Sequence, residues 1–240
     1  QNVVVGDEAG TAITTGDANV AVGYAALDAL DTGINNTAVG WNAGGALSQG
    51  TRNVALGYAT LDADTLGSKS TAIGYAALST QNFTSATDTF NTAVGFSAGT
   101  AVTTGINNIL IGGIAGDALT DADRNVAIGT QALSADTLGS KSIAIGDAAL
   151  RTQNFTTATD TFNVAVGHNA GLAVTTAIKN TLIGGLAGDG ISSGDGLNVA
   201  VGFGALGASS NTTQENVAIG VDALSTEDGH GRNVAVGFEA

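Results

Sequence analysis

An internal repeat of about seventeen residues constrains this chain more than any other feature. A glycine preceded by Val, Ile or Leu returns fourteen times, and nine of the thirteen intervals are seventeen residues long. The other intervals are eighteen residues (twice) and twenty-one residues (twice). A unit this short cannot bury its apolar side chains alone, so successive copies must stack on one another. The repeat therefore predicts an all-β parallel solenoid of fourteen turns. The glycines are Gly6, Gly23, Gly40, Gly57, Gly74, Gly95, Gly112, Gly129, Gly146, Gly167, Gly184, Gly202, Gly220 and Gly237.

The sequence also contains a longer duplication that spans several of these repeats. Residues 53–124 align with residues 125–196, and about two-thirds of the aligned positions are identical. Both copies contain one of the long intervals, which arise from residues 81–90 and 153–162. A block of four turns was therefore duplicated whole. Because the repeat runs through the entire chain, the sequence predicts one solenoid domain over residues 1–240.

Composition restricts the core and the partners. The chain has 36 glycines, no cysteine and no proline, and only 5% of its residues are aromatic. Such a chain fills a narrow core with small side chains, without disulfides or thiolate metal sites. The net charge is −14, which argues against binding a nucleic-acid backbone or an anionic membrane. No stretch reaches the eighteen apolar residues of a membrane span, so no membrane insertion is expected of this segment.

A column of asparagines stands four residues before the repeat glycine. Ser70 and Ser142 replace asparagine in two of the fourteen turns. Stacked amides can hydrogen-bond along a solenoid, and asparagine tolerates the left-handed backbone of a sharp corner. We interpret the column as a structural ladder and not as a ligand site. Its members are Asn2, Asn19, Asn36, Asn53, Asn91, Asn108, Asn125, Asn163, Asn180, Asn198, Asn216 and Asn233.

The residues between asparagine and glycine alternate in the manner of a strand. In the second repeat, Val20 and Val22 point to one face and Ala21 to the other. Both faces are apolar, whereas a lone solenoid needs only one apolar face. We expect the Val/Ile face to fill the core of the chain itself, and the alanine face to meet another copy.

An aromatic column directly follows the repeat glycine. Two interpretations are open: the rings pack against the next turn or a neighbouring chain, or they form a platform for sugar rings or a receptor. Three residues after the glycine, thirteen of the fourteen turns have alanine, and either leucine or glycine comes next. The candidate contact residues are Tyr24, Trp41, Tyr58, Tyr75, Phe96, Phe203 and Phe238.

Candidate residues for chemistry are few. His168 and His230 lie several repeats apart, so a metal site shared by both within one rigid chain is not expected. The Asp62-Ala-Asp64 and Asp121-Ala-Asp123 segments could supply oxygen ligands to Ca²⁺, but the nonapeptide typical of Ca²⁺-binding β-rolls is missing. We therefore predict no catalytic residue, no enzyme activity and no cofactor, with Ca²⁺ as the one cation considered.

The repeat resembles a known class of surface protein. The unit Asn-x-Val/Thr-Ala-Val/Ile-Gly, as in residues 19–23, 91–95 and 125–129, is similar to the head repeat of YadA-type trimeric autotransporter adhesins. The longer unit over residues 36–44 is similar to repeats of phage tail fibres. The resemblance covers the whole chain. It implies a left-handed parallel β-roll, three chains packed about one axis, and a role in surface attachment.

The sequence thus predicts a structural and adhesive segment of a trimeric fibre, extracellular and carried on a cell-surface appendage or a virion. The expected partners are copies of the chain, as a homotrimer and by end-to-end stacking, and a host-surface receptor or glycan. Two alternatives stay open. An ice- or mineral-binding solenoid requires a regular threonine ladder, and threonine pairs here are sporadic. A carbohydrate-processing β-helix spike requires clustered carboxylates, whereas the acidic residues here are scattered.

Overall fold

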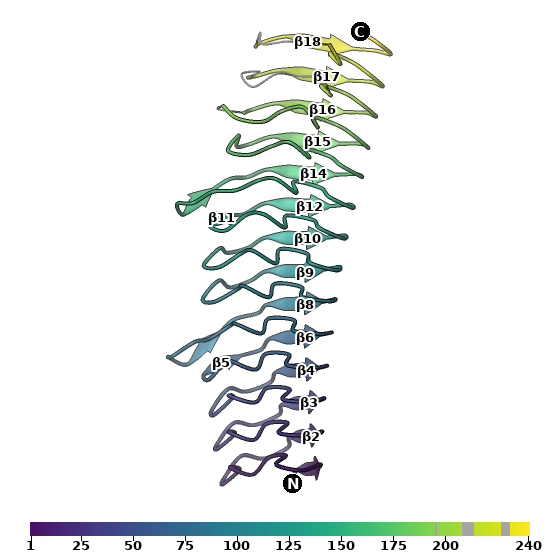
Figure 1. The fold of residues 1–240 in the computed structure, drawn as a ribbon. Helices are drawn as coiled ribbons and strands as arrows, with labels where there is room; N and C mark the ends of the chain where they lie inside the picture. The colour runs from purple at the N-terminus through teal and green to yellow at the C-terminus, as the bar shows by residue number, and fades with distance from the viewer. Residues whose placement is uncertain (195, 208–213, 227–230) are drawn as a thin grey trace. The chain divides into compact units, whose positions relative to one another are not determined.

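The computed structural model describes residues 1–194, 196–207, 214–226 and 231–240. The chain divides into two compact units, residues 1–121 and residues 122–240, and each is described by itself. Fourteen strands of three residues carry the repeat and bound about thirteen complete turns of the chain (Figure 1). The all-β parallel solenoid with a spacing of about seventeen residues is confirmed. The prediction of a single domain over residues 1–240 stays a prediction.

The first unit contains seven repeat strands and one small additional sheet. Its main sheet has the order β1-β2-β3-β4-β6-β8-β9, and every neighbouring pair is parallel and in register. The short strands β5 and β7 pair with each other in the turns that contain the first long interval. The strands are β1 (Val3–Val5), β2 (Val20–Val22), β3 (Thr37–Val39), β4 (Val54–Leu56), β5 (Gly67–Ser68), β6 (Thr71–Ile73), β7 (Thr87–Asp88), β8 (Thr92–Val94) and β9 (Ile109–Ile111).

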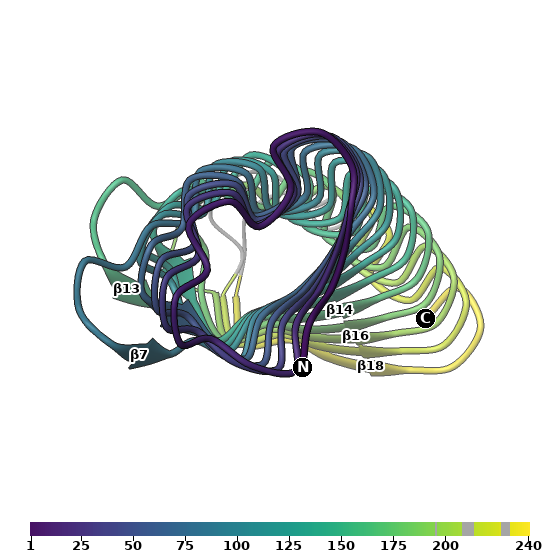
Figure 2. The same cartoon turned by 90° about the horizontal axis from the view of Figure 1, so that it is seen from below.

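The second unit repeats this plan. Its main sheet has the order β10-β12-β14-β15-β16-β17-β18, and β11 pairs with β13. Seen along the stack of turns, the segments that carry β7 and β13 each protrude beyond the other turns of their own unit (Figure 2). The strands are β10 (Val126–Ile128), β11 (Gly139–Ser140), β12 (Ile143–Ile145), β13 (Thr159–Asp160), β14 (Val164–Val166), β15 (Thr181–Ile183), β16 (Val199–Val201), β17 (Val217–Ile219) and β18 (Val234–Val236).

The direction of the strand side chains is the reverse of the sequence prediction. Between β2 and β17, Ala21 and its equivalents point into the solenoid and are buried, whereas Val20 and Val22 are only half-buried on the outside. The expectation of a Val/Ile core and an alanine interface was therefore wrong. The reason is space: leucines from the rest of each turn, such as Leu27 and Leu30, occupy the interior, and only a small side chain fits opposite them.

The residue after the buried alanine is leucine in some turns and glycine in others. A leucine side chain of one turn fills the space beside the glycine of a neighbouring turn. A side chain at Gly44 would overlap Leu27 of the preceding turn and press on Leu47 of its own turn. Where two glycine turns follow one another, at Gly99 and Gly116, Leu110 replaces the strand alanine and its two methyl groups fill both spaces. The interior thus keeps a constant packed volume while its residues change from turn to turn.

Left-handed backbone recurs in every turn, but not at the asparagines of the ladder column. The residue immediately before the asparagine has positive φ, for example Ala18 (57°) and Arg52 (60°), so the expectation that asparagine supplies this conformation was wrong. The repeat glycine itself has φ between 130° and 143°, and a Cβ at Gly23 would overlap the carbonyl of Gly40 in the next turn. Only glycine satisfies both conditions. Stacking can hold non-glycine residues in the left-handed region because each turn is hydrogen-bonded to the next.

Candidate binding surface

The asparagine column lies inside the solenoid from Asn19 to Asn216. Asn19 Oδ1 accepts a hydrogen bond from the backbone N–H of Asn36 at 2.9 Å, and Asn19 Nδ2 donates to the carbonyl oxygen of Gly33 at 2.9 Å. Equivalent bonds join Asn36 to Asn53 and Asn163 to Asn180. These side chains are at most 1% exposed. They satisfy backbone groups at a corner of each turn and are closed to any external ligand.

A buried glutamine replaces the missing amide where serine interrupts the column. Gln81 Nε2 donates to Ser70 Oγ at 2.9 Å and to Asp64 Oδ2 at 2.6 Å, and its Oε1 accepts from Asn91 Nδ2 at 2.8 Å. Gln153 repeats all three contacts in the second unit, with Ser142, Asp136 and Asn163. Sequence reasoning missed both glutamines. Their identical offset from the two serines, within the duplicated long intervals, was the signal that could have revealed them.

Five aromatic rings of the first unit stack into one continuous ladder. Successive ring centroids are 6.0, 4.7, 5.0 and 5.2 Å apart, and the rings are parallel within 15°. The spacing follows from the distance between neighbouring strands of a sheet, which is about 4.8 Å. All five side chains remain more than 40% exposed. The ladder is formed, in order, by Tyr24, Trp41, Tyr58, Tyr75 and Phe96.

Stacking determines what the aromatic ladder can offer to a ligand. Each inner ring has both faces against its neighbours, so Trp41, Tyr58 and Tyr75 present only their edges to solvent. A sugar ring binds an aromatic side chain through the open face of the aromatic ring. Free ring faces therefore exist only at the two ends of the ladder, at Tyr24 and at Phe96.

The two ends differ in their surroundings. At Tyr24 the preceding turn has Asp7 in the same column, and a hydrogen bond with Glu8 raises the pKa of the Tyr24 hydroxyl. At Phe96 the following turn has Gly113, and a Cβ built on that glycine meets no atom within 4 Å. Phe96 is 60% exposed, the highest value in the ladder. One end of the ladder is thus acidic, and the other is apolar and open.

The second unit has no such ladder among its described residues. The same column there contains Thr130, Asp147 and His168, followed by Gly185 and Phe203. Phe203 lies against Gly185, with its ring 3.3 Å from the position that a Cβ would occupy. Phe238, in the last turn, is 72% exposed. The structure therefore brings together five of the seven aromatic residues that the sequence singled out, and leaves Phe203 and Phe238 apart from them.

The outer face of the repeat strands is an exposed apolar surface, which we call the strand face. It consists of the first and third residues of every repeat strand, such as Thr37 and Val39 in β3. Of these 28 positions, 24 have Val, Ile or Leu, four have Thr, and none is charged. Val39 is 39% exposed and Ile183 is 41% exposed. With only four threonines, the strand face has no regular threonine ladder of the kind that an ice-binding surface requires.

The candidate metal ligands are dispersed. Asp64 is buried and accepts hydrogen bonds from the backbone N–H groups of Gly67 and Phe83 and from Gln81, so its carboxylate serves the protein itself. Burial raises the pKa of both Asp64 and Asp62. His168 is exposed, with its Nδ1 4.0 Å from Asp147 Oδ1, and His230 lies outside the described residues. Within the described residues, no three His, Asp or Glu side chains are grouped as metal ligands would be.

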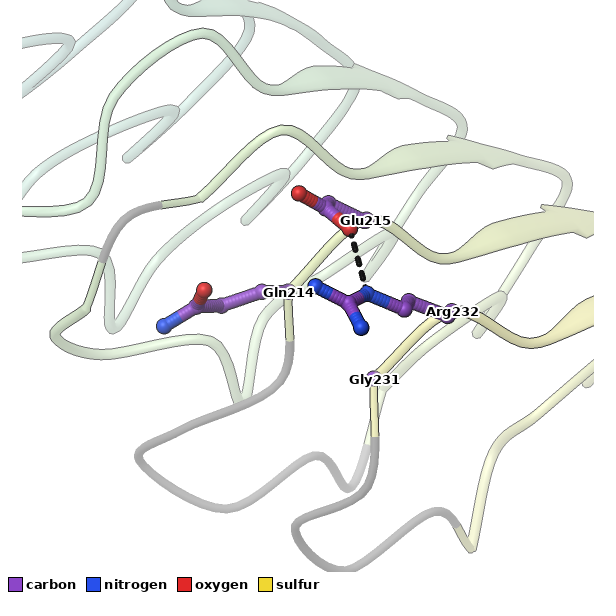
Figure 3. A pocket seen from close by; sticks show the side chains of 4 residues that line it. All are labelled: Gln214, Glu215, Gly231 and Arg232. Carbon is purple, nitrogen blue, oxygen red and sulfur yellow. Dashed lines mark hydrogen bonds and ion pairs between the residues drawn. The ribbon is translucent and has the colours of Figure 1, made fainter.

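A shallow pocket lies near the C-terminal turns. It is lined by Gln214, Glu215, Gly231 and Arg232, and Arg232 Nε donates to Glu215 Oε2 at 2.8 Å (Figure 3). Both residues of this ion pair are exposed, so the pair is worth little in water.

Comparison of the chain with protein-family models, with curated proteins and with solved structures finds no match. Within the described residues, no helix has the length and apolar character needed to cross a bilayer.

Proposed function

We propose that this chain is a structural and adhesive segment of an elongated extracellular fibre, built from three copies wound as left-handed parallel rolls. The fibre belongs to a bacterial surface adhesin or a phage tail, and it performs no catalysis. The observation that carries the proposal is the strand face, where 28 outward positions contain no charged residue in a chain of net charge −14.

An unpartnered face of this kind is unusual for a lone solenoid. A surface strand normally alternates apolar and polar residues so that its outer side meets water. Here 24 of the 28 outer positions have Val, Ile or Leu, and the outer side remains partly exposed, as at Val39 and Ile183. Large exposed apolar surfaces mark interaction sites, and the simplest partner for a repeated surface is the same surface on another copy.

The chemistry of the strand face suits a symmetric assembly. β-Branched side chains on a regular sheet present flat rows, and such rows interdigitate well with equivalent rows. Burying this face about a common axis requires no charged group to be desolvated. The acidic side chains are thereby left on the remaining surface, where they keep the assembly soluble.

The adhesive part of the proposal rests on the aromatic ladder. Tyr24, Trp41, Tyr58, Tyr75 and Phe96 follow the repeat glycine, whereas the strand face precedes it. An assembly through the strand face therefore keeps the ladder as a second, separate contact surface. Aromatic side chains exposed in a continuous row are typical of contact surfaces.

Light scattering coupled to size exclusion tests the assembly. The wild-type chain of 23.3 kDa is expected to elute as a trimer of about three times that mass. Replacing Val39→Lys together with Ile183→Lys places charges on the strand face and is expected to give monomers of unchanged β content. Both side chains are already about 40% exposed, so the fold tolerates the replacement. The control Ser85→Lys, at an exposed position away from the strand face, should stay trimeric.

A wild-type chain that remains monomeric at high protein concentration would contradict the proposal. An experimental structure of the assembly tests the handedness of the roll. Retention of labelled trimers on intact bacterial envelopes, compared between the wild type and a Trp41→Ser, Tyr58→Ser variant, tests the adhesive role of the ladder. Equal retention of both proteins would assign the ladder a purely structural role.

A further inference from the structure

We propose that the free face of Phe96 and the backbone of Gly113 form a stacking site for one planar aromatic ring of a small ligand that is uncharged or cationic. The site terminates the aromatic ladder of the first unit. It depends neither on trimer formation nor on attachment to a surface, and its test can fail independently of theirs.

The geometry of the ladder leaves one ring position empty. Phe96 stacks on Tyr75 with a centroid distance of 5.2 Å, which covers one of its faces. The next turn continues directly, because the backbone N–H of Ile114 donates to the carbonyl oxygen of Phe96 at 2.8 Å. A sixth ring would belong at residue 113, and a glycine stands there with no atom within 4 Å of the missing Cβ. The other face of Phe96 is thus not covered by a side chain of residue 113.

The second unit has an aromatic ring against the equivalent glycine, and there the ring comes from the turn that follows the glycine. Gly185 is the equivalent of Gly113 in the duplicated block, and there the ring of Phe203 lies 3.3 and 3.6 Å from the missing Cβ. The chain itself therefore packs a flat aromatic ring on the glycine of this column. At Gly113 the equivalent space is free. An aromatic ring is the occupant that both the stacked ladder on one side and the bare glycine backbone below it would contact.

The charge of the first unit restricts the ligand further. Residues 1–121 contain ten Asp and Glu residues and two Lys and Arg residues, a formal charge of −8. An anionic ring, or a base attached to a phosphate chain, is repelled by this field, whereas a cationic ring is attracted to it. The ligand class is therefore a flat aromatic with no negative charge.

A titration with thioflavin T, a planar cationic aromatic, tests the site on the full chain. Fluorescence and calorimetry should report saturable binding that Gly113→Phe weakens by about fivefold or more, since a stacked ring contributes about 1 to 3 kcal/mol. Gly113 has no left-handed φ and its Cβ would meet open space, so Gly113→Phe is expected to fold normally. Phe96→Ser should weaken binding similarly, and Phe238→Ser, an exposed ring of the same column elsewhere, should leave it unchanged.

Each outcome decides the proposal. Binding that is lost in Gly113→Phe and in Phe96→Ser but kept in Phe238→Ser supports it. No saturable binding, or binding equally strong in Gly113→Phe, overturns it. Methyl glucoside provides a further arm: saturable binding of this sugar with the same sensitivity, and none of thioflavin T, would replace the aromatic ligand by a carbohydrate. Light scattering on the same samples measures the oligomeric state. A chain that does not form trimers can therefore be distinguished from a chain that does not bind the ligand.

Discussion

The two copies of the four-turn block are residues 53–124 and residues 125–196. Their buried residues form the same contacts, whereas their surface residues differ. The buried network around Gln81 returns around Gln153 with the same partners at nearly the same distances. Leu110 and Leu182 fill the same double space between glycine turns. Interior positions are held by several partners at once, so a change at one of them leaves a cavity or an unpaired polar group.

The surface column of the same two blocks differs at three of its four positions, and only Gly113 and Gly185 are the same. Tyr58, Tyr75 and Phe96 in the first copy correspond to Thr130, Asp147 and His168 in the second. Nothing in the fold requires a ring at these positions, since the second copy forms the same strands without one. The comparison therefore separates residues that build the solenoid from residues that determine what it contacts. It also limits the stacked surface to the first unit.

The largest expected effect tests whether the two interiors are equivalent. Leu110→Ala and Leu182→Ala each remove a fully buried side chain that fills space above two glycine turns. Each should lower the free energy of unfolding by about 3 to 5 kcal/mol, because the two glycines that face the removed side chain cannot fill the cavity. Urea unfolding followed by circular dichroism measures this. Clearly unequal losses of stability in the two variants would show that the interiors of the two copies are not packed alike.

A smaller effect is expected from the ladder. Tyr58→Thr inserts the residue of the second copy and removes two stacked pairs, with centroid distances of 4.7 and 5.0 Å. The loss should be about 1 to 2 kcal/mol, and the fluorescence of Trp41, the only tryptophan, should change as its neighbour is lost. The reverse change in the second copy, Thr130→Tyr, has no ring in the next turn to stack on and should change stability by less than about 0.5 kcal/mol. Equal effects of the two changes would contradict the role of stacking.

The smallest effect concerns the acidic residues. Asp62, whose Oδ1 has no hydrogen-bond partner, has a pKa raised by burial, and the second copy has Ser134 in its place. A carboxyl with a raised pKa in the folded state favours folding when it is protonated. This contribution is complete below the pKa of the unfolded chain, about 3.9, and is lost as the pH rises through the raised value.

The change Asp62→Ser should therefore stabilise the chain at pH 7 by no more than about 0.5 kcal/mol, and should reduce the rise in stability as the pH is lowered toward 4. Thermal unfolding of both proteins between pH 4 and pH 7 measures the difference. Parallel pH profiles would show that Asp62 is not responsible. Asp117 keeps its counterpart, Asp189, and burial raises the pKa of both, so the paired variants Asp117→Asn and Asp189→Asn should match each other.

Much of the architecture could be predicted from the spacing of residues alone. The repeat glycines predicted the stacked parallel strands, since any insertion other than in a loop would break the register of all later turns. The asparagine column and the aromatic column were likewise visible, because stacking turns the same position in each repeat into a physical row. The duplication of residues 53–124 as residues 125–196 equally predicted two structurally matching blocks.

Which side of the strand faces inward could not be derived in this way. Val20, Ala21 and Val22 are all apolar, so hydrophobicity does not separate the two faces. The answer depends on Leu27 and Leu30, which fill the interior from the rest of the turn and leave room only for alanine. Packing between segments decided this point, and no strand pattern contains that information.

The sequence by itself determined the repeat, its stacking and the rows that stacking creates, because each of these follows from periodicity. Only the tertiary structure decided that the apolar strand face is exposed, that Gln81 completes the amide column, and that the rings stack face to face up to the gap at Gly113. These three properties depend on distances between side chains of different turns. Such distances are set by how tightly the interior packs, which the order of residues along the chain does not state.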